Sequence, residues 1–321
     1  MNDYVDILQF RSDSLVKYTQ HIRTFEGLGY SRNTTQMKLS IENKREQLKL
    51  HRKQAYSGEM TEGSKKRLQK ALDVFYFRSP LQHVFNPVTN RTQSFKYIFI
   101  TLTLAGNHSD KEATQVHKDL LEPFLRWLRD SKKVTDYIWK AELQKNGNIH
   151  YHITTNQFVL HTDVRNKWND LQFNRGYLKE WSDQHGHSNP HGTEVKAVKS
   201  DNDFMKYLRK YVSKEDKEGR KIVGKVWDCS RVLKEVKRFS TVIDSQVDDM
   251  LDLLCQLGKI EPLFFDKCII YRGIGANWFK NISHTIRREL CEHFGTIKKA
   301  IVEDSIQLVD ETVQLVDDSF K

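Results

Sequence analysis

The sequence lacks the features of a membrane or secreted protein. A membrane-spanning helix needs about 20 consecutive apolar residues, and no stretch of the 321-residue chain approaches that length. The opening residues Met1 to Tyr4 show no signal-peptide pattern. Cysteine is scarce, and none of the four cysteines belongs to a CxxC pair. We therefore expect a cytoplasmic protein with reduced thiols and no membrane partner.

A phosphate-binding loop of the P-loop type is missing as well. The segment Gly58 to Lys65 comes close to this motif, which requires Gly-Lys-Ser/Thr at its end. Here the order is Gly63-Ser64-Lys65, and no β-rich run precedes it. We predict a turn that opens a basic helix.

Acidic residues are unevenly distributed along the chain. The net charge is +10, but residues 301–321 hold six acidic residues and one basic residue, which gives −5 and leaves +15 on the first 300 residues. A basic body of this kind indicates a polyanionic partner such as nucleic acid. Within the acidic end, Gln-Leu-Val-Asp recurs after seven residues. This repeat predicts an amphipathic helix that packs on the basic body or contacts a partner.

The order of strand and helix patterns indicates an α+β fold. Residues 96–105 give the strongest strand pattern, and their β-branched content predicts an interior place in a sheet. Further strands are expected at 134–143, 146–155 and 194–199, with helices after residue 110, at 163–178 and at 203–214. Pro123 should kink or restart the first of these helices. We predict an antiparallel-rich sheet with helices on one face, close to a ferredoxin-like layout.

Helical extensions are expected on both sides of this sheet. Residues 1–75 read as helical and basic, and helical patterns return beyond residue 238. The predicted organisation is a basic N-terminal segment over 1–92, a nuclease-like domain over 93–237, and a helical C-terminal region with the acidic tail over 238–321.

Two histidines lie two positions apart in the strand that follows Asn146-Gly147. Alternate residues of a strand point to the same face, so His150 and His152 project together while Tyr151 faces the other way. Two imidazoles on one rigid face form half of a metal site. The alternative is a half-exposed strand with two solvated histidines.

The preceding strand can add a carboxylate to this pair. If residues 145–147 form a three-residue loop with Gly147 left-handed, Glu142 lies opposite His150. A two-residue loop would instead place Glu142 opposite Tyr151, on the other face. Only the first register brings the carboxylate to the two imidazoles.

The capped helix at 203–214 carries two tyrosines. Tyr207, Lys210, Tyr211 and Lys214 follow helical spacing and form one stripe. The two phenols are expected about 6 Å apart, each followed three residues later by an ammonium group. An ordinary amphipathic helix with tyrosines at the edge of the core would show the same pattern.

Three segments together resemble the rolling-circle replication initiators of the HUH endonuclease superfamily. Residues 98–103 are similar to the core-strand motif of that family, His150-Tyr151-His152 to its His-hydrophobic-His motif, and residues 207–214 to its tyrosine helix. The doubled Tyr-x-x-Lys is similar to the two-tyrosine initiators of small single-stranded DNA phages, the microviruses. Residues 224–230 also look like a segment of that group.

The resemblance covers about residues 56–235, and it has two departures. The middle residue of the histidine motif is the aromatic Tyr151 rather than a bulky aliphatic residue. The flanks show no helicase motif, unlike some larger initiators of the superfamily.

The resemblance implies a nick made by tyrosine attack on single-stranded DNA at a replication origin. Tyr207 or Tyr211 would form a 5′-phosphotyrosyl link and leave a 3′-hydroxyl that primes synthesis, with religation at the end. Because a phenol has a pKa near about 10, it needs activation. Lys210 and Lys214 would stabilise the phenolate and the charge at phosphorus.

The implied cofactor is a divalent cation held by His150, His152 and Glu142. Mixed nitrogen and oxygen ligands suit Mn²⁺, and Mg²⁺ with retained waters also fits. The ion would polarise the phosphate and orient the scissile bond. The implied partners are origin single-stranded DNA and host replication machinery such as a helicase, in the cytoplasm of a bacterial host.

Three other functions are compatible with parts of the sequence. A plasmid relaxase or a single-strand transposase would use the same chemistry. A metal-free two-histidine phosphoesterase would use two His-x-Thr motifs, which the chain has at His152 and His191, although His191 lies in a polar loop. A non-catalytic single-stranded DNA-binding protein would need only the basic surface.

Overall fold

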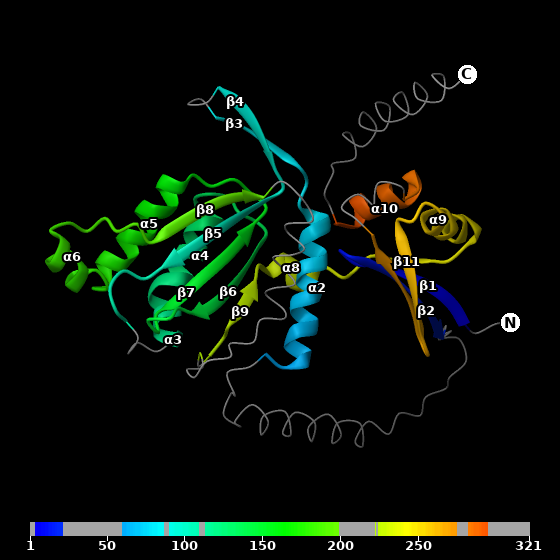
Figure 1. Cartoon of the computed structure of the whole chain (residues 1–321), viewed down its shortest axis with the longest axis horizontal. Helices are drawn as coiled ribbons and strands as arrows, with labels where there is room; N and C mark the ends of the chain where they lie inside the picture. Colours follow the sequence, from blue (N-terminus) through cyan, green and yellow to red (C-terminus); the bar gives the residue numbers. More distant parts are fainter. Residues whose placement is uncertain are drawn as a thin grey trace, which may run out of the picture.

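The computed structural model describes residues 4–21, 60–86, 90–108, 113–198, 222, 224–274 and 282–294. Two five-stranded sheets lie on either side of a long helix, α2 (Glu62–Arg78), as Figure 1 shows. One sheet carries the histidine strand and is called here the histidine sheet. The other combines strands from both ends of the chain and is called the terminal sheet. An α+β protein with antiparallel sheets is confirmed, while the ferredoxin-like layout stays a prediction.

The histidine sheet has the order β8-β5-β7-β6-β9, and every neighbouring pair is antiparallel. Its strands are β5 (Tyr97–Thr103), β6 (Tyr137–Leu143), β7 (Ile149–Thr155), β8 (Thr193–Val198) and β9 (Trp227–Cys229). The expected strands at 96–105, 134–143, 146–155 and 194–199 are therefore all present. As predicted, β5 is an interior strand.

The helices that follow β5 and β7 cover one face of this sheet. They are α3 (Ala113–Val116), η1 (His117–Leu121), α4 (Glu122–Asp130) and α5 (His161–Asn174), with the short α6 (Lys179–His185) beyond. Alternate side chains such as Ile100 and Ile153 are fully buried against them. Pro123 lies in the first turn of α4, directly after the π-helical turn η1, so the predicted restart is confirmed.

The other face of the histidine sheet is polar at one end and packs on α2 at the other. Strand alternation places His150, His152 and Glu142 on this face. Leu68 and Leu72 of α2 belong to the same apolar cluster as Ile138. The helix therefore leaves only part of the histidine face open.

The expectation of a helical N-terminus is wrong over residues 4–21. These residues form β1 (Tyr4–Phe10) and β2 (Ser14–His21), which enter the terminal sheet in the order β10-β1-β2-β12-β11. Beyond residue 238, helices alternate with strands rather than forming a helical region. The elements are β10 (Ser240–Val242), α9 (Ser245–Gln256), β11 (Ile260–Phe265), β12 (Cys268–Gly273) and α10 (His284–Phe294).

Helix α2 joins the two sheets through one apolar cluster. Phe75 of α2 is fully buried in it, together with Phe10 of the terminal sheet and Tyr97 of the histidine sheet. The helix begins at the Thr61 cap, whose side chain accepts a hydrogen bond from the Ser64 backbone, as a helix N-terminus requires.

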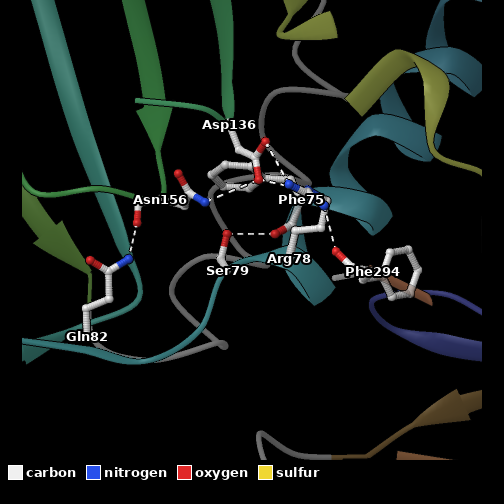
Figure 2. Close-up of polar contacts among 7 residues, drawn as sticks. All are labelled: Phe75, Arg78, Ser79, Gln82, Asp136, Asn156 and Phe294. Carbon is white, nitrogen blue, oxygen red and sulfur yellow. Dashed lines mark hydrogen bonds and ion pairs between the residues drawn. The ribbon is translucent and has the colours of Figure 1, made fainter. Parts of the chain in front are cut away.

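Polar contacts fix the C-terminal end of α2, as Figure 2 shows. Arg78 forms a 2.9 Å ion pair with the buried Asp136 and donates to the backbone oxygen of Phe294 in α10. Asn156, directly after β7, donates to the same carboxylate. Burial raises the pKa of Asp136 above its ordinary value, although the hydrogen bond and charge of Arg78 oppose this shift. One arginine thus connects α2, the histidine sheet and α10.

The remaining elements are a ribbon and a short helix. Strands β3 (Gln82–Asn86) and β4 (Arg91–Phe95) form a separate two-stranded ribbon that extends away from the sheets in Figure 1. Helix α8 (Arg231–Glu235) packs beside α2. All four cysteines (Cys229, Cys255, Cys268 and Cys291) are thiols, as expected. Across the described ranges, no helix is long and apolar enough to cross a membrane.

Candidate functional site

The turn between β6 and β7 has the conformation that the sequence predicts. Gly147 has a φ of 83°, in the left-handed region that glycine adopts at little cost. Its backbone N–H donates to the oxygen of Gln144 at 2.8 Å, and the Gln144 N–H donates to Asn148 at 2.9 Å. The three-residue loop at 145–147 is confirmed, and it sets the register of the whole hairpin.

That register brings the predicted carboxylate to the histidine pair. Glu142 lies directly opposite His150. The His152 Nε2 atom is 3.8 Å from a carboxylate oxygen of Glu142, and the two imidazole rings are 4.3 Å apart between centroids. Lys140 is 3.5 Å from the other carboxylate oxygen. The three predicted side chains therefore share one partly open face, with a buried lysine beside them.

Two threonines of β5 orient the imidazoles, and the sequence analysis gave them no role. The Thr103 hydroxyl is 3.0 Å from Nδ1 of His150, and the Thr101 hydroxyl is 3.4 Å from Nδ1 of His152. A metal-binding histidine commonly holds its second ring nitrogen in such a hydrogen bond, which fixes the ring orientation and the tautomer. The signal was present in the sequence, since both threonines share one parity in the strand that pairs with β7.

The hairpin turn is anchored to the loop after β5. Asn148 is fully buried. Its side chain accepts a 2.7 Å hydrogen bond from the His108 backbone and donates one of 2.7 Å to the Gly106 oxygen. Because each buried polar atom of this amide has a partner, the turn and the neighbouring His150 are held on a rigid support.

The donor set fits a divalent cation by chemistry, but the side chains are not gathered around one point. Within the part of the chain that the structure describes, no three histidine, cysteine, aspartate or glutamate side chains form a ready metal-binding group. Two imidazoles and a carboxylate are ligands that Mn²⁺ accepts. Closing Glu142, His150 and His152 around one ion requires side-chain rotations from the present arrangement, so the metal site stays a proposal.

The predicted nucleophiles lie outside the described residues. Tyr207, Lys210, Tyr211 and Lys214 all belong to the range 199–221, as does most of the helix expected at 203–214. The acidic repeat in 301–321 is outside them too. Their predicted roles therefore stay predictions.

The geometry argues against the two-histidine phosphoesterase. Thr193 pairs with Leu102, whose side chain is buried on the helix-covered face, whereas His152 pairs with Thr101. The Thr193 hydroxyl contacts His161 of α5, and His191 contacts Arg165 of the same helix. The two His-x-Thr motifs thus lie on opposite faces of the sheet and cannot share one cleft.

A family comparison adds independent support for the class of protein. The model of a family of replication-associated proteins, described by its ORF2 members, matches residues 97–216, less than half of the 321-residue chain. The match begins at β5, includes the histidine pair and extends past Tyr211. Over these residues the chain is similar to that family, and this similarity supports a family of rolling-circle replication initiators. No curated protein and no solved structure matches the chain.

Proposed function

We propose that this protein is a replication initiator that nicks single-stranded DNA at an origin by tyrosine attack and later religates it. The observation that carries the proposal is the register of β6 and β7, which places Glu142, His150 and His152 on one face. The family match over residues 97–216 points to the same class. The closer resemblance to two-tyrosine microvirus initiators rests on the doubled Tyr-x-x-Lys at Tyr207 and Tyr211.

The reaction needs few groups from the protein. The phenolic oxygen of Tyr207 or Tyr211 attacks the phosphorus atom and loses its proton to water. The bond from phosphorus to the 3′ oxygen breaks, and that oxygen takes up a proton and becomes the priming 3′-hydroxyl. Lys210 and Lys214 lower the energy of the phenolate and of the charge that develops on the phosphate.

The histidine face supplies the electrophilic half of the site. His150, His152 and Glu142 would hold Mn²⁺ or Mg²⁺, which polarises the phosphate when bound. Thr103 and Thr101 keep the imidazoles turned to this face through their Nδ1 contacts. Lys140 places a buried positive charge beside Glu142. The face is therefore already biased toward an anionic group before DNA binds.

The first experiment looks for the covalent intermediate. The full chain is incubated with Mn²⁺ and a random pool of single-stranded DNA, so the origin need not be known, and adducts that resist denaturant are collected. We expect sequencing of the attached 5′ ends to converge on one motif. His150→Ala and His152→Ala should abolish the adduct and leave DNA binding intact, because the basic surface is unchanged.

Matched controls separate the site from general effects. His185→Ala and His187→Ala make the same chemical change at exposed positions near α6, and they should retain the adduct. Full adduct formation by the double variant His150→Ala/His152→Ala in EDTA would overturn the proposed site. Salt-sensitive binding without an adduct in any divalent metal would identify a non-catalytic single-stranded DNA-binding protein.

A second experiment asks why there are two tyrosines. One polypeptide needs a second nucleophile after a full circuit, because the first is still bonded to the DNA end. Tyr207→Phe and Tyr211→Phe should each form some adduct on a short oligonucleotide, and the double variant none. Each single variant should fail to release closed circles. If one tyrosine makes every adduct and the other is dispensable for release, the protein is a one-tyrosine enzyme.

The wider setting follows from the same proposal. A relaxase or a single-strand transposase would pass the adduct test, and the DNA motif recovered with the adduct would separate them from an origin nickase. Unwinding ahead of the nick would come from a host helicase. The site of action would be the cytoplasm of a bacterial host.

A further inference from the structure

A pocket opens between the first half of α2 and strand β9. Its volume is about 510 Å³, which is within the range that holds a small ligand. We call it the α2–β9 pocket. Its lining residues are Ser64, Arg67, Lys70, Ala71, Gly224, Lys225, Val226, Trp227, Asp228, Cys229, Leu233 and Lys234.

The lining is strongly basic. Four of the residues are cationic and one is acidic, which leaves a net charge of +3. Burial would raise the pKa of Asp228, but hydrogen bonds from Lys225 and Lys234 outweigh it and lower the pKa. Burial lowers the pKa of Lys70, and the nearby Arg238 lowers it further. The cations thus outnumber the groups that neutralise them.

Arg67 contributes a cation that the described part of the chain does not neutralise. Its side chain is exposed, and among the described residues it has no ion pair. By contrast, Lys225 and Lys234 both pair with Asp228 at 2.8 Å, and Lys70 donates to the Lys234 backbone oxygen. The pocket therefore combines a held cluster of lysines with one arginine available for an anion.

An indole ring forms the wall of the pocket nearest the histidine sheet. Trp227 is half-buried, and its Nε1–H donates to the Ser64 hydroxyl at 2.8 Å. This bond connects β9 to α2 and fixes the orientation of the ring. Aromatic side chains beside cations are the usual platform on which single-stranded nucleic acids stack their bases.

The position of Trp227 relates the pocket to the histidine face. Trp227 pairs with Lys140, and Lys140 pairs with His152 across the next strand. Directly opposed residues share a face of the sheet. Two strand spacings of about 4.8 Å place the backbones of Trp227 and His152 on the order of 10 Å apart. A strand bound at the histidine face could reach the pocket within a few nucleotides.

We propose that the α2–β9 pocket binds one nucleotide of single-stranded DNA beside the scissile phosphate, with the base on Trp227 and the backbone phosphate near Arg67. The proposal rests on the proposed function for the location of the cut. The pocket's role is to set the position of the strand across Lys140, so that one phosphate faces His150 and His152. Binding there involves no covalent step.

Photocrosslinking tests the location directly. The full chain is irradiated with a short oligothymidylate that carries a photoreactive thymine analogue, and the crosslinked peptides are mapped. We expect crosslinks at residues 224–234. Crosslinks confined to other segments would overturn the proposal.

Variants test the contribution of the ring and of the cations. Trp227→Leu should weaken oligonucleotide binding about ten-fold, which is the usual order for loss of one stacked base. Trp227→Phe and Ser64→Ala lose only the hydrogen bond to α2 and should bind nearly as the wild type. If Ser64→Ala weakens binding as much as Trp227→Leu, the indole only supports the fold and the proposal fails.

Salt dependence identifies the phosphate contact. Arg67→Gln should lower the slope of log affinity against log salt concentration by about 0.7, the value for one contact to a single strand. Lys179→Gln, an exposed change on α6, is the matched control and should leave the slope unchanged. An equal change in both variants would mean that only net charge matters, and it would overturn the pocket assignment.

These outcomes separate the two proposals. Crosslinks at 224–234 with no covalent adduct in the nicking assay would support the pocket and reject the nickase. An adduct in the nicking assay, with wild-type binding by Trp227→Leu and Arg67→Gln, would support the nickase and reject the pocket. Circular dichroism and thermal melting of each variant confirm that the comparison is between folded proteins.

Discussion

At the scale of single residues, the histidine pair depends on hydroxyl groups of the neighbouring strand β5. Thr103 contacts His150 at 3.0 Å, whereas Thr101 contacts His152 at 3.4 Å. The shorter contact also has better hydrogen-bond geometry by distance. Orientation of the two imidazoles is therefore divided unequally between the two threonines.

Thr103→Val should consequently reduce nicking more than Thr101→Val. The change keeps the side-chain shape and removes the hydroxyl, and loss of such a supporting partner typically costs roughly 10- to 100-fold in metal affinity or activity. The rate of adduct formation as a function of Mn²⁺ concentration measures the effect, and raising Mn²⁺ should partly restore the rate. Equal rates for both variants and the wild type would show that the threonines only fill the sheet.

Cys229 provides a test of burial at the base of β9. Burial raises the pKa of its thiol to about 12, and the nearby Asp228 carboxylate adds to this shift. We expect Cys229 to resist alkylation at neutral pH, while the partly exposed Cys255, Cys268 and Cys291 react. Mass spectrometry of the alkylated native protein measures the order, and rapid labelling of Cys229 would contradict its burial.

The same thiol predicts a loss of stability at high pH. In the unfolded chain the Cys229 thiol ionises near its ordinary pKa of 9.0, whereas the folded protein retains the proton up to about pH 12. The folded state therefore binds the proton more tightly, so its contribution to the free energy of unfolding is present below pH 9 and is lost as the pH rises toward 12. Urea unfolding of the wild type and of Cys229→Ala should converge over that interval.

At the scale of elements, the β6–β7 hairpin depends on one glycine. Gly147→Ala would force a side chain into the left-handed region, at a cost of about 1–2 kcal/mol in the free energy of unfolding. Gly176 has a similar φ of 76° with open space around its Cβ position, so Gly176→Ala is the matched control. Both variants should lose similar stability in urea, but only Gly147→Ala should also lose nicking, because only that turn sets Glu142 opposite His150.

The hairpin was predictable because its determinants are local. A left-handed glycine, an odd loop length and strand alternation together fix which residues face each other, and all three can be read within residues 142–152. The same reasoning failed for β1 and β2. Val16 of β2 pairs with Ile270, and Ile7 of β1 pairs with Val242. Partners this distant in the sequence leave no local trace, so these residues were read as helix.

The candidate site was predictable to a similar extent. His150, His152 and Glu142 follow from the hairpin, while the threonines of β5 and the α2–β9 pocket require the sheet order and the position of α2. Lys140 was also missed, because a buried lysine between Trp139 and Ala141 has no distinctive sequence pattern.

At the scale of the whole molecule, the ion pair between Arg78 and Asp136 holds α2 against the histidine sheet. Arg78→Met would leave a buried carboxylate without its partner and should cost about 3–5 kcal/mol at neutral pH. The cost should shrink in acid, because Asp136 then takes up a proton. Adding Asp136→Asn should recover much of the loss in thermal melts, and a double variant no more stable than Arg78→Met would argue against this ion pair.

The acidic tail makes a second prediction at this scale. Residues 301–321 carry −5 against +15 on the rest of the chain. If they shield the basic body, deleting them should raise non-specific DNA affinity and steepen its salt dependence. Titrations at several salt concentrations measure both quantities. Unchanged binding would leave the tail as a packing or partner-binding surface.

The terminal sheet has a consequence for the birth of the protein on the ribosome. Strands β1 and β2 emerge first, but β10 and β12, which flank them, begin only at residues 240 and 268. At about 5–20 residues per second, the first hairpin waits on the order of 10 to 50 seconds with both edges unpaired. The histidine sheet can form during this wait, because all its strands lie between residues 97 and 229. Nascent chains stalled before residue 240 should therefore need chaperone protection of an exposed β-hairpin.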